Sequence, residues 1–193
     1  MGYSTDFSGQ FNLDKRLDDE TFNFLNKFAN TRRMARHFDQ NGTAYGVEGE
    51  FYVDGKGSMG QDTDETVIDG NRPPRTQPGL WCQWIPTEDH MSIEWDGGEK
   101  FYNYEEWLLY IINNFLAPKG YTLNGQVKWQ GEYGDDFGIL KVRNNIVTCV
   151  HGQKFYNDPE ETPAVKKPRK KRISKSKAVV AEPVHKPRRL NLE

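Results

Sequence analysis

The chain of 193 residues is 13% aromatic and nearly neutral, because 26 Lys and Arg stand against 28 Asp and Glu. No apolar run reaches the roughly 20 residues of a membrane-spanning helix, and the first residues lack the basic and apolar segments of a secretion signal. We therefore expect a cytoplasmic protein that is neither secreted nor embedded in a membrane.

The near-neutral total conceals two oppositely charged parts. Residues 162–193 carry 11 Lys and Arg against 2 acidic residues, a net charge of +9, which leaves 15 basic and 26 acidic residues, a net charge of −11, for residues 1–161. A segment with so much like charge and so little apolar surface cannot offset the entropy lost on folding. We predict one folded domain over residues 1–155 and a disordered basic tail over residues 156–193.

The folded part opens with a strand and a helix. Residues 3–13 place Phe7 and Phe11 at a spacing that fits a period of two, which predicts a strand with one buried face. Asp18 stands where a helix N-cap is expected, and the apolar residues after it recur at helical spacing as far as the Arg32 region.

The remaining pattern alternates strands with one further helix. A helix is predicted over residues 104–116, capped by Asn103 and ended by Pro118. Strands are predicted over residues 47–54, 80–85, 91–95, 99–102, 121–132, 138–143 and 146–151, with tight turns at 96–98 and 144–145 and a long polar loop over 55–78. Strands joined by short turns favour a mostly antiparallel sheet with two helices packed on it, an α+β fold.

Two loop patterns suggest ligands at first sight but fit poorly. Residues 55–60 match GxGxxG, yet acidic residues rather than a helix follow, and these would repel a phosphate. Asp62, Asp64 and Asp69 lack the central Gly of a calcium loop. The two cysteines, Cys82 and Cys149, form no CxxC pair and are expected to be free thiols. No metal site and no cofactor is expected.

An arginine cluster and a pair of carboxylates form the first candidate site. Arg32, Arg33 and Arg36 follow the first helix, where cations favour the helix dipole but could also hold an anion. Glu48 and Glu50 share one face of the strand predicted over residues 47–54, either as water-facing surface or as acid, base or metal ligand.

The tryptophan-rich segment from residue 77 to residue 104 forms the second candidate site. Polar residues, among them Gln83, alternate with aromatic rings there, as in a small-molecule or peptide pocket, although core packing explains the rings equally well. In a strand Trp81 and Trp84 point to opposite faces, so only one can face a core on one side of the sheet. We expect Trp84 to be the outward one and Trp107 to be core.

Several runs within residues 2–150 make the chain resemble a family of bacterial and bacteriophage proteins. These are Gly2-Tyr3-Ser4-Thr5-Asp6-Phe7, Glu50-Phe51-Tyr52-Val53, Met59-Gly60-Gln61-Asp62, the run from Gln77 to Trp84, the run from Glu94 to Trp107, and Gly120-Tyr121-Thr122-Leu123-Asn124-Gly125. The family has no assigned activity, so the resemblance implies a cytoplasmic setting, that of the host for a phage protein, and no mechanism.

The basic tail lies outside this resemblance and carries the leading functional hypothesis. Its charges suit nonspecific contact with nucleic acid or another polyanion, and it has no aromatic residue after Tyr156 to stack on bases. The nucleic-acid-binding candidates are Lys166, Lys167, Arg169, Lys170, Lys171, Arg172, Lys175, Lys177, Arg188 and Arg189.

Two functions from different classes remain open. The first is a non-enzymatic phage or bacterial accessory protein, whose tail contacts nucleic acid, an acidic partner such as a host protein, or its own acidic body. The second is an enzyme acting on a nucleotide-like phosphorylated ligand, with the arginine cluster holding the anion and Glu48 or Glu50 as base.

Overall fold

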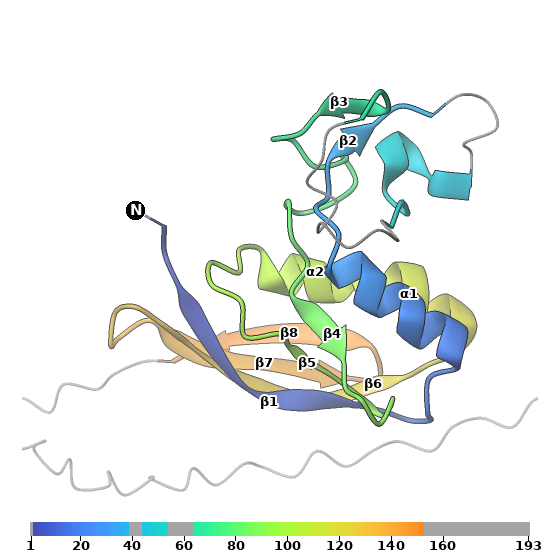
Figure 1. Cartoon of the computed structure of the whole chain (residues 1–193). Helices are drawn as coiled ribbons and strands as arrows, with labels where there is room; N and C mark the ends of the chain where they lie inside the picture. The colour runs from blue at the N-terminus through green and yellow to red at the C-terminus, as the bar shows by residue number, and fades with distance from the viewer. Residues whose placement is uncertain (1, 39–43, 54–63, 153–193) are drawn as a thin grey trace, which may run out of the picture. The chain divides into compact units, whose positions relative to one another are not determined.

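A six-stranded antiparallel sheet with two helices on one face forms the centre of the protein (Figure 1). The computed structural model describes residues 2–38, 44–53 and 64–152. The architecture confirms the predicted α+β fold with its two packed helices. The basic tail and the GxGxxG run lie outside the described residues.

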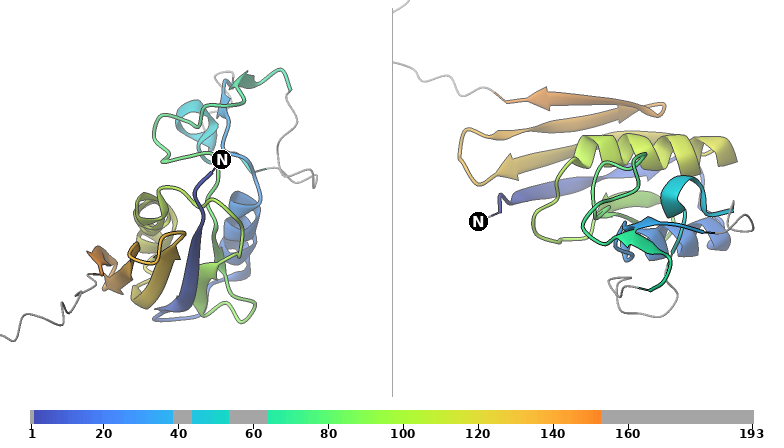
Figure 2. Two further views of the ribbon diagram at one scale, coloured as in Figure 1. Left: turned by 90° about the vertical axis from the view of Figure 1, so that its left-hand side faces the viewer. Right: turned by 90° about the horizontal axis from the view of Figure 1, so that it is seen from above.

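The strands follow the order β4-β5-β1-β6-β7-β8 across the main sheet, and a short pair, β2 and β3, forms a second sheet. The elements are β1 Thr5–Leu13, α1 Asp19–Ala29, β2 Ala35–Arg36, β3 Val67–Asp69, β4 Trp84–Pro86, β5 Ser92–Trp95, α2 Tyr104–Ile111, β6 Leu123–Gly131, β7 Phe137–Arg143 and β8 Ile146–His151. Figure 2 shows both helices lying along the same side of the main sheet.

Alternation along the strands creates the core. In β1 and β6, Phe11 and Val127 are fully buried and point toward the helices, while Ser8 and Lys128 point to the opposite, exposed face. The helices contribute Phe28, Leu108 and other residues to this core, and Trp107 is fully buried as predicted. Among the described residues, no helix is both long and apolar enough to cross a membrane.

The helix boundaries follow local sequence signals. Asp18 caps α1, because its carboxylate accepts a hydrogen bond from the backbone N–H of Thr21 at 2.6 Å. The second helix begins after Asn103 as predicted, but the Asn103 side chain donates to the Pro78 carbonyl at 2.6 Å and makes no capping bond. The helix continues as a π-helical turn over Ile112–Leu116.

The strand predicted over residues 47–54 is wrong. Val47–Gly49 form a 3₁₀ turn, and Gly46, Glu48 and Gly49 all have positive φ values, of 71°, 51° and 76°. The left-handed backbone at these positions folds the segment tightly. The alternation of apolar and polar residues in this segment therefore does not reflect an extended strand.

The hairpin predicted around residues 96–98 is also wrong. Residues 99–102 are not a strand, and Lys100 has a φ of 60° that interrupts extended backbone. The strand β5 instead pairs with β4 through a turn that includes His90, whose φ is 64°. The strand predicted over residues 80–85 shortens accordingly to Trp84–Pro86.

Candidate functional site

Two arginines of the predicted anion site are held by protein groups. The buried Arg36 donates from Nη1 to both carboxylate oxygens of Asp64, at 3.1 and 2.9 Å, and to the Thr66 hydroxyl at 2.8 Å. Its guanidinium also lies 4.1 Å from the centre of the Tyr52 ring. Arg32 donates from Nε to the Gly70 carbonyl at 3.0 Å.

The third arginine, Arg33, is only 2% exposed and differs from the other two. It donates one hydrogen bond to the Tyr52 carbonyl and lies 4.4 Å from the centre of the Phe28 ring. Its Nε and Nη1 atoms have no hydrogen-bond partner among the described residues. Burial, which removes water from the charged group, lowers the pKa of Arg33 to about 10.

The two candidate carboxylates lie in separate environments and do not share a strand face. Glu48 accepts two hydrogen bonds from Arg72, at 3.0 and 3.2 Å, and one from the backbone N–H of Arg75, and these contacts hold its pKa below the usual range. Glu50 is buried and accepts hydrogen bonds from the Tyr110 hydroxyl at 2.9 Å and the Thr76 hydroxyl at 2.6 Å.

The fold therefore places Arg36 beside the segment that carries the two carboxylates, but the charged atoms on both sides bind other groups. A Cβ added at Gly49, between the two glutamates, would lie 2.9 Å from the Cβ of Arg36. Each carboxylate nevertheless binds hydroxyl or guanidinium groups of Arg72, Thr76 and Tyr110. These contacts fix the loops that carry the glutamates, and they occupy the oxygens that a base or metal ligand needs free.

The prediction that Trp84 faces outward is wrong. Trp84 is only 1% exposed, and its Nε1 donates to the Tyr104 carbonyl at 2.8 Å. It pairs with Trp95 across β4 and β5, on the sheet face that the helices cover. Trp81 lies before β4 begins and is the partly exposed tryptophan of the pair.

Trp81 lines a cleft of about 400 Å³ within the tryptophan-rich segment. Gln83, predicted as a binding residue, also lines it, and its amide is fixed by Trp95 Nε1 at 3.1 Å and by the Glu99 carbonyl at 3.0 Å. The full lining is Gly79, Leu80, Trp81, Gln83, Glu99, Lys100, Tyr102 and Asn103. An aromatic wall with one acidic and one basic side chain suits a small polar ligand.

Sequence reasoning located this segment but missed the left-handed backbone at two residues that line the cleft, Lys100 and Asn103. Their φ values are 60° and 55°. Asparagine adopts that geometry more readily than most residues, so Asn103 was the available signal.

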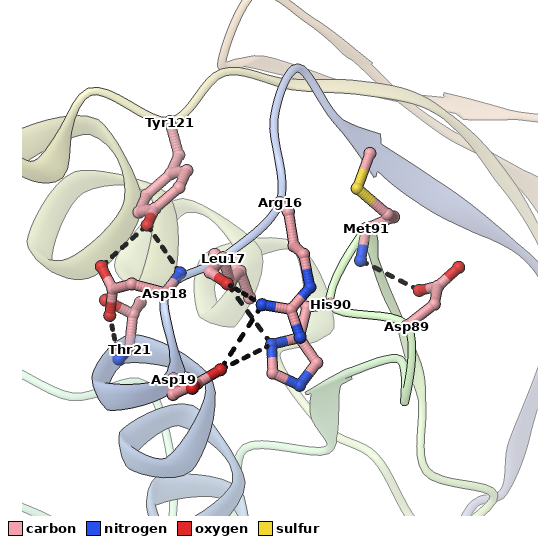
Figure 3. Close-up of polar contacts among 9 residues, drawn as sticks. All are labelled: Arg16, Leu17, Asp18, Asp19, Thr21, Asp89, His90, Met91 and Tyr121. Atoms are coloured by element: carbon pink, nitrogen blue, oxygen red, sulfur yellow. Dashed lines mark hydrogen bonds and ion pairs between the residues drawn. The ribbon is translucent and has the colours of Figure 1, made fainter.

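A second polar cluster surrounds the start of α1 (Figure 3). The hydrogen bond from the Thr21 backbone N–H, together with one from the Tyr121 hydroxyl at 2.9 Å, lowers the pKa of Asp18 to about 2. The His90 ring stacks on Phe22 with 3.7 Å between ring centres, and its Nδ1 lies 3.7 Å from the Asp19 carboxylate. These contacts fasten the β4–β5 turn to α1.

The cysteines and metal-ligating groups offer no chemistry in the described part of the chain. Cys82 and Cys149 are both free, as expected, and burial raises the pKa of Cys82 to about 12. The pKa of Cys149 is also raised, mainly by burial, so both favour the unreactive thiol. The residues with described positions contain no group of three or more His, Cys, Asp or Glu that could hold a metal ion.

Comparison with known proteins assigns no family. No family model matches the chain, and no curated protein or solved structure matches it either. The ten basic tail candidates, from Lys166 to Arg189, lie outside the described residues.

Proposed function

We propose that this chain is a non-enzymatic accessory protein of a phage or bacterial cytoplasm, whose basic tail contacts nucleic acid or another polyanion without reading sequence. The observation that supports this proposal is the separation of charge, +9 over residues 162–193 against −11 over residues 1–161. Like-charged segments bind phosphates through release of counterions, which needs no defined tail geometry.

The geometry of the folded part favours this proposal over the enzyme alternative. That alternative needs an arginine cluster open to a phosphate and a carboxylate free to take a proton. Arg36 instead pairs with Asp64, and Glu48 pairs with Arg72. Glu50 is buried, and its carboxylate accepts hydrogen bonds from the hydroxyl groups of Thr76 and Tyr110.

Duplex DNA binding across a salt series tests the proposal. The test variant of the full chain replaces Lys166, Lys167, Arg169, Lys170, Lys171 and Arg172 with Gln, and the matched control replaces Ser174 and Ser176 with Ala. Each phosphate contact contributes a slope of about 0.9 to the fall of log affinity with log salt concentration. We expect the Gln variant to lose affinity and up to about 5 units of this slope, with the control unchanged.

A truncation after residue 161 separates the tail from the folded part. If the truncated chain binds duplex DNA with the affinity and salt slope of the full chain, the proposal is contradicted. The enzyme alternative would gain support if a phosphorylated ligand instead raised the melting temperature of the truncated chain, and if Arg33→Met abolished that rise.

A further inference from the structure

The strand β8 is an edge strand without the usual protection against pairing. Among the described residues, no strand pairs with its outer side, and its six residues include no Lys, Arg, Asp, Glu or Pro. Ile146 is 70% exposed and Val150 is 43% exposed. The opposite edge of the sheet, β4, has three residues and ends on Pro86. Natural sheets blunt exposed edges with short strands, charges or proline, so β8 is the unprotected edge.

The backbone of β8 presents a regular row of outward hydrogen-bonding groups. Gly152 N–H donates to the Phe137 carbonyl at 2.7 Å, and Arg143 pairs with Ile146 across the two-residue turn. Antiparallel pairs alternate between hydrogen-bonded and non-hydrogen-bonded positions. The even-numbered residues of β8 therefore bond to β7, and Val147, Cys149 and His151 direct their N–H and C=O groups away from the sheet.

The exposed apolar side chains of β8 all lie on the sheet face that the helices leave open. Val150 pairs with Ile139 and Ile146 pairs with Arg143, both of which point to that face. An apolar cleft of about 510 Å³ lies there, with Phe137, Ile139 and Val150 in its wall. These side chains form an apolar strip, Phe137, Ile139 and Val150, that extends across the open face to the sheet edge at β8.

We propose that β8 pairs antiparallel with β8 of a second copy of this chain, with the two-fold axis at Thr148. In this register Val147 is opposite Cys149 of the second copy, and the outward N–H and C=O groups of these residues bond to one another. Ile146 of each copy is opposite Val150 of the other, at closely spaced non-hydrogen-bonded positions. Two β-branched side chains opposite each other are a favourable cross-strand pair.

A second copy fits this edge because the strand is complementary to itself. Residues opposite one another in an antiparallel sheet point to the same face. In a symmetric β8 pair, one residue must therefore lie opposite its own copy, with the two-fold axis between the two copies of that residue. Centring on Cys149 would leave Ile146 opposite Gly152, whereas centring on Thr148 covers both exposed apolar residues. No formal charge of β8 lies in the contact, and the apolar strip continues from Ile139 and Val150 onto Ile146 of the second copy.

Charge placed on the axis tests the pairing in the full chain. Thr148 is exposed, and its β7 neighbour on that face is Lys141. We expect the native chain to sediment at twice the 22.4 kDa mass of one chain. In a homodimer of Thr148→Lys or of Thr148→Glu, two like charges would lie opposite each other at the axis, so each variant by itself should sediment as a monomer. An equimolar mixture of the two variants should form a heterodimer. The matched control Ile68→Lys, at a site 55% exposed on β3, should remain a dimer.

Three outcomes would overturn the pairing. They are a native chain that stays monomeric at the highest attainable concentration, a Thr148→Lys chain that remains a dimer, and a mixture of the two charged variants that fails to associate. Each variant should keep its fold, because the substituted side chain points to solvent in the monomer, and circular dichroism checks this.

Thiol cross-linking tests the register. With the axis at Thr148, a Thr148→Cys, Cys149→Ser chain brings two thiols into directly opposite positions, so diamide should link them in a disulfide. The native Cys149 thiols lie diagonally across the axis, with their Cα atoms beyond the roughly 7 Å limit for a disulfide, and Cys82 is fully buried. Efficient cross-linking of the native chain, with none of the variant, would overturn the proposed register.

Discussion

Arg33 carries a positive charge inside the protein without an ion pair to any described carboxylate. Its side chain donates one hydrogen bond to the Tyr52 carbonyl, while Nε and Nη1 have no partner in the part of the chain that the structure describes. An unpaired buried charge and unsatisfied donors both destabilise a fold. The charge of Arg33 therefore destabilises the fold, whereas Arg36, whose Nε also has no partner among the described residues, forms an ion pair with Asp64.

This contrast predicts opposite effects for one substitution at two neighbouring positions. Arg33→Met removes a desolvated charge and keeps apolar bulk, so we expect the free energy of unfolding to stay the same or to rise by about 1 kcal/mol. Arg36→Met removes three hydrogen bonds and should lower it by about 1–3 kcal/mol. Urea denaturation measures both, and a loss at Arg33 equal to that at Arg36 would contradict the interpretation.

Asp18 predicts the acid limb of the stability profile. Because the pKa of Asp18 is lowered from 3.8 to about 2 in the folded protein, the ionised cap stabilises the fold fully above pH 3.8. That stabilisation is lost as the pH falls from 3.8 toward 2. Urea denaturation of Asp18→Asn should show a deficit at pH 6 that shrinks toward pH 2. Asp19→Asn, whose side chain is 80% exposed, is the control and should show a smaller deficit.

Among the elements, β1 and β6 each contain a glycine with positive φ, Gly9 and Gly125, at which an added Cβ would lie close to the backbone of the neighbouring strand. Gly125 has a φ of 133°, and a Cβ there would lie 3.1 Å from the Gln10 carbonyl oxygen. Gly125→Ala should therefore lower the free energy of unfolding by about 2–4 kcal/mol, from backbone strain and steric contact together.

Gly97 supplies the matched control for that substitution. Its φ is 81°, but a Cβ there would meet nothing within 4 Å. Gly97→Ala should cost about 1–2 kcal/mol, because only the left-handed backbone opposes it. Equal losses at the two positions in thermal denaturation would show that contact with β1 does not matter.

Elements with a local signal could be predicted from the sequence. The first helix has an N-cap at Asp18, and the turn between β7 and β8 has Asn144 and Asn145, both with positive φ as a tight turn requires. The segment at Glu48 has a partial signal in Gly46 and Gly49, both with positive φ, but glutamate itself is not a residue that marks left-handed backbone. Its geometry is held by Arg72, which is 24 residues away in sequence and could not be paired with it beforehand.

The surroundings of the candidate-site residues could not be predicted from the sequence for a related reason. Sequence alternation placed Trp81 and Trp84 on opposite faces of one strand, but Trp81 lies before β4 begins, and the alternation does not show that the helices cover the face of Trp84. Of the arginine cluster, Arg36 lies beside Gly49, which stands between the two candidate carboxylates in sequence. Whether a charged side chain is free or engaged depends on distant partners such as Asp64, and periodicity carries no information about these.

At the scale of the whole molecule, the edge pairing and the basic tail combine into one prediction. A dimer formed through β8 carries two tails, each with the +9 charge of residues 162–193. Once one tail has bound a duplex, the second binds at a high effective concentration, which raises the overall affinity. Loss of the dimer should therefore weaken DNA binding even where the tails are intact.

Thr148→Lys tests this coupling, because the added charge and the loss of the dimer should change the affinity for DNA in opposite directions. The substitution adds a positive charge, which alone would strengthen binding to a polyanion. If it also separates the dimer, affinity for a long duplex should instead fall by about tenfold or more at fixed salt, at a concentration where the native chain is dimeric. The decrease should vanish on a duplex too short for two tails, because only one can then bind. A monomeric Thr148→Lys chain that binds the long duplex as tightly as the native chain would show that the tails act independently, whatever the outcome of the sedimentation and salt-series experiments.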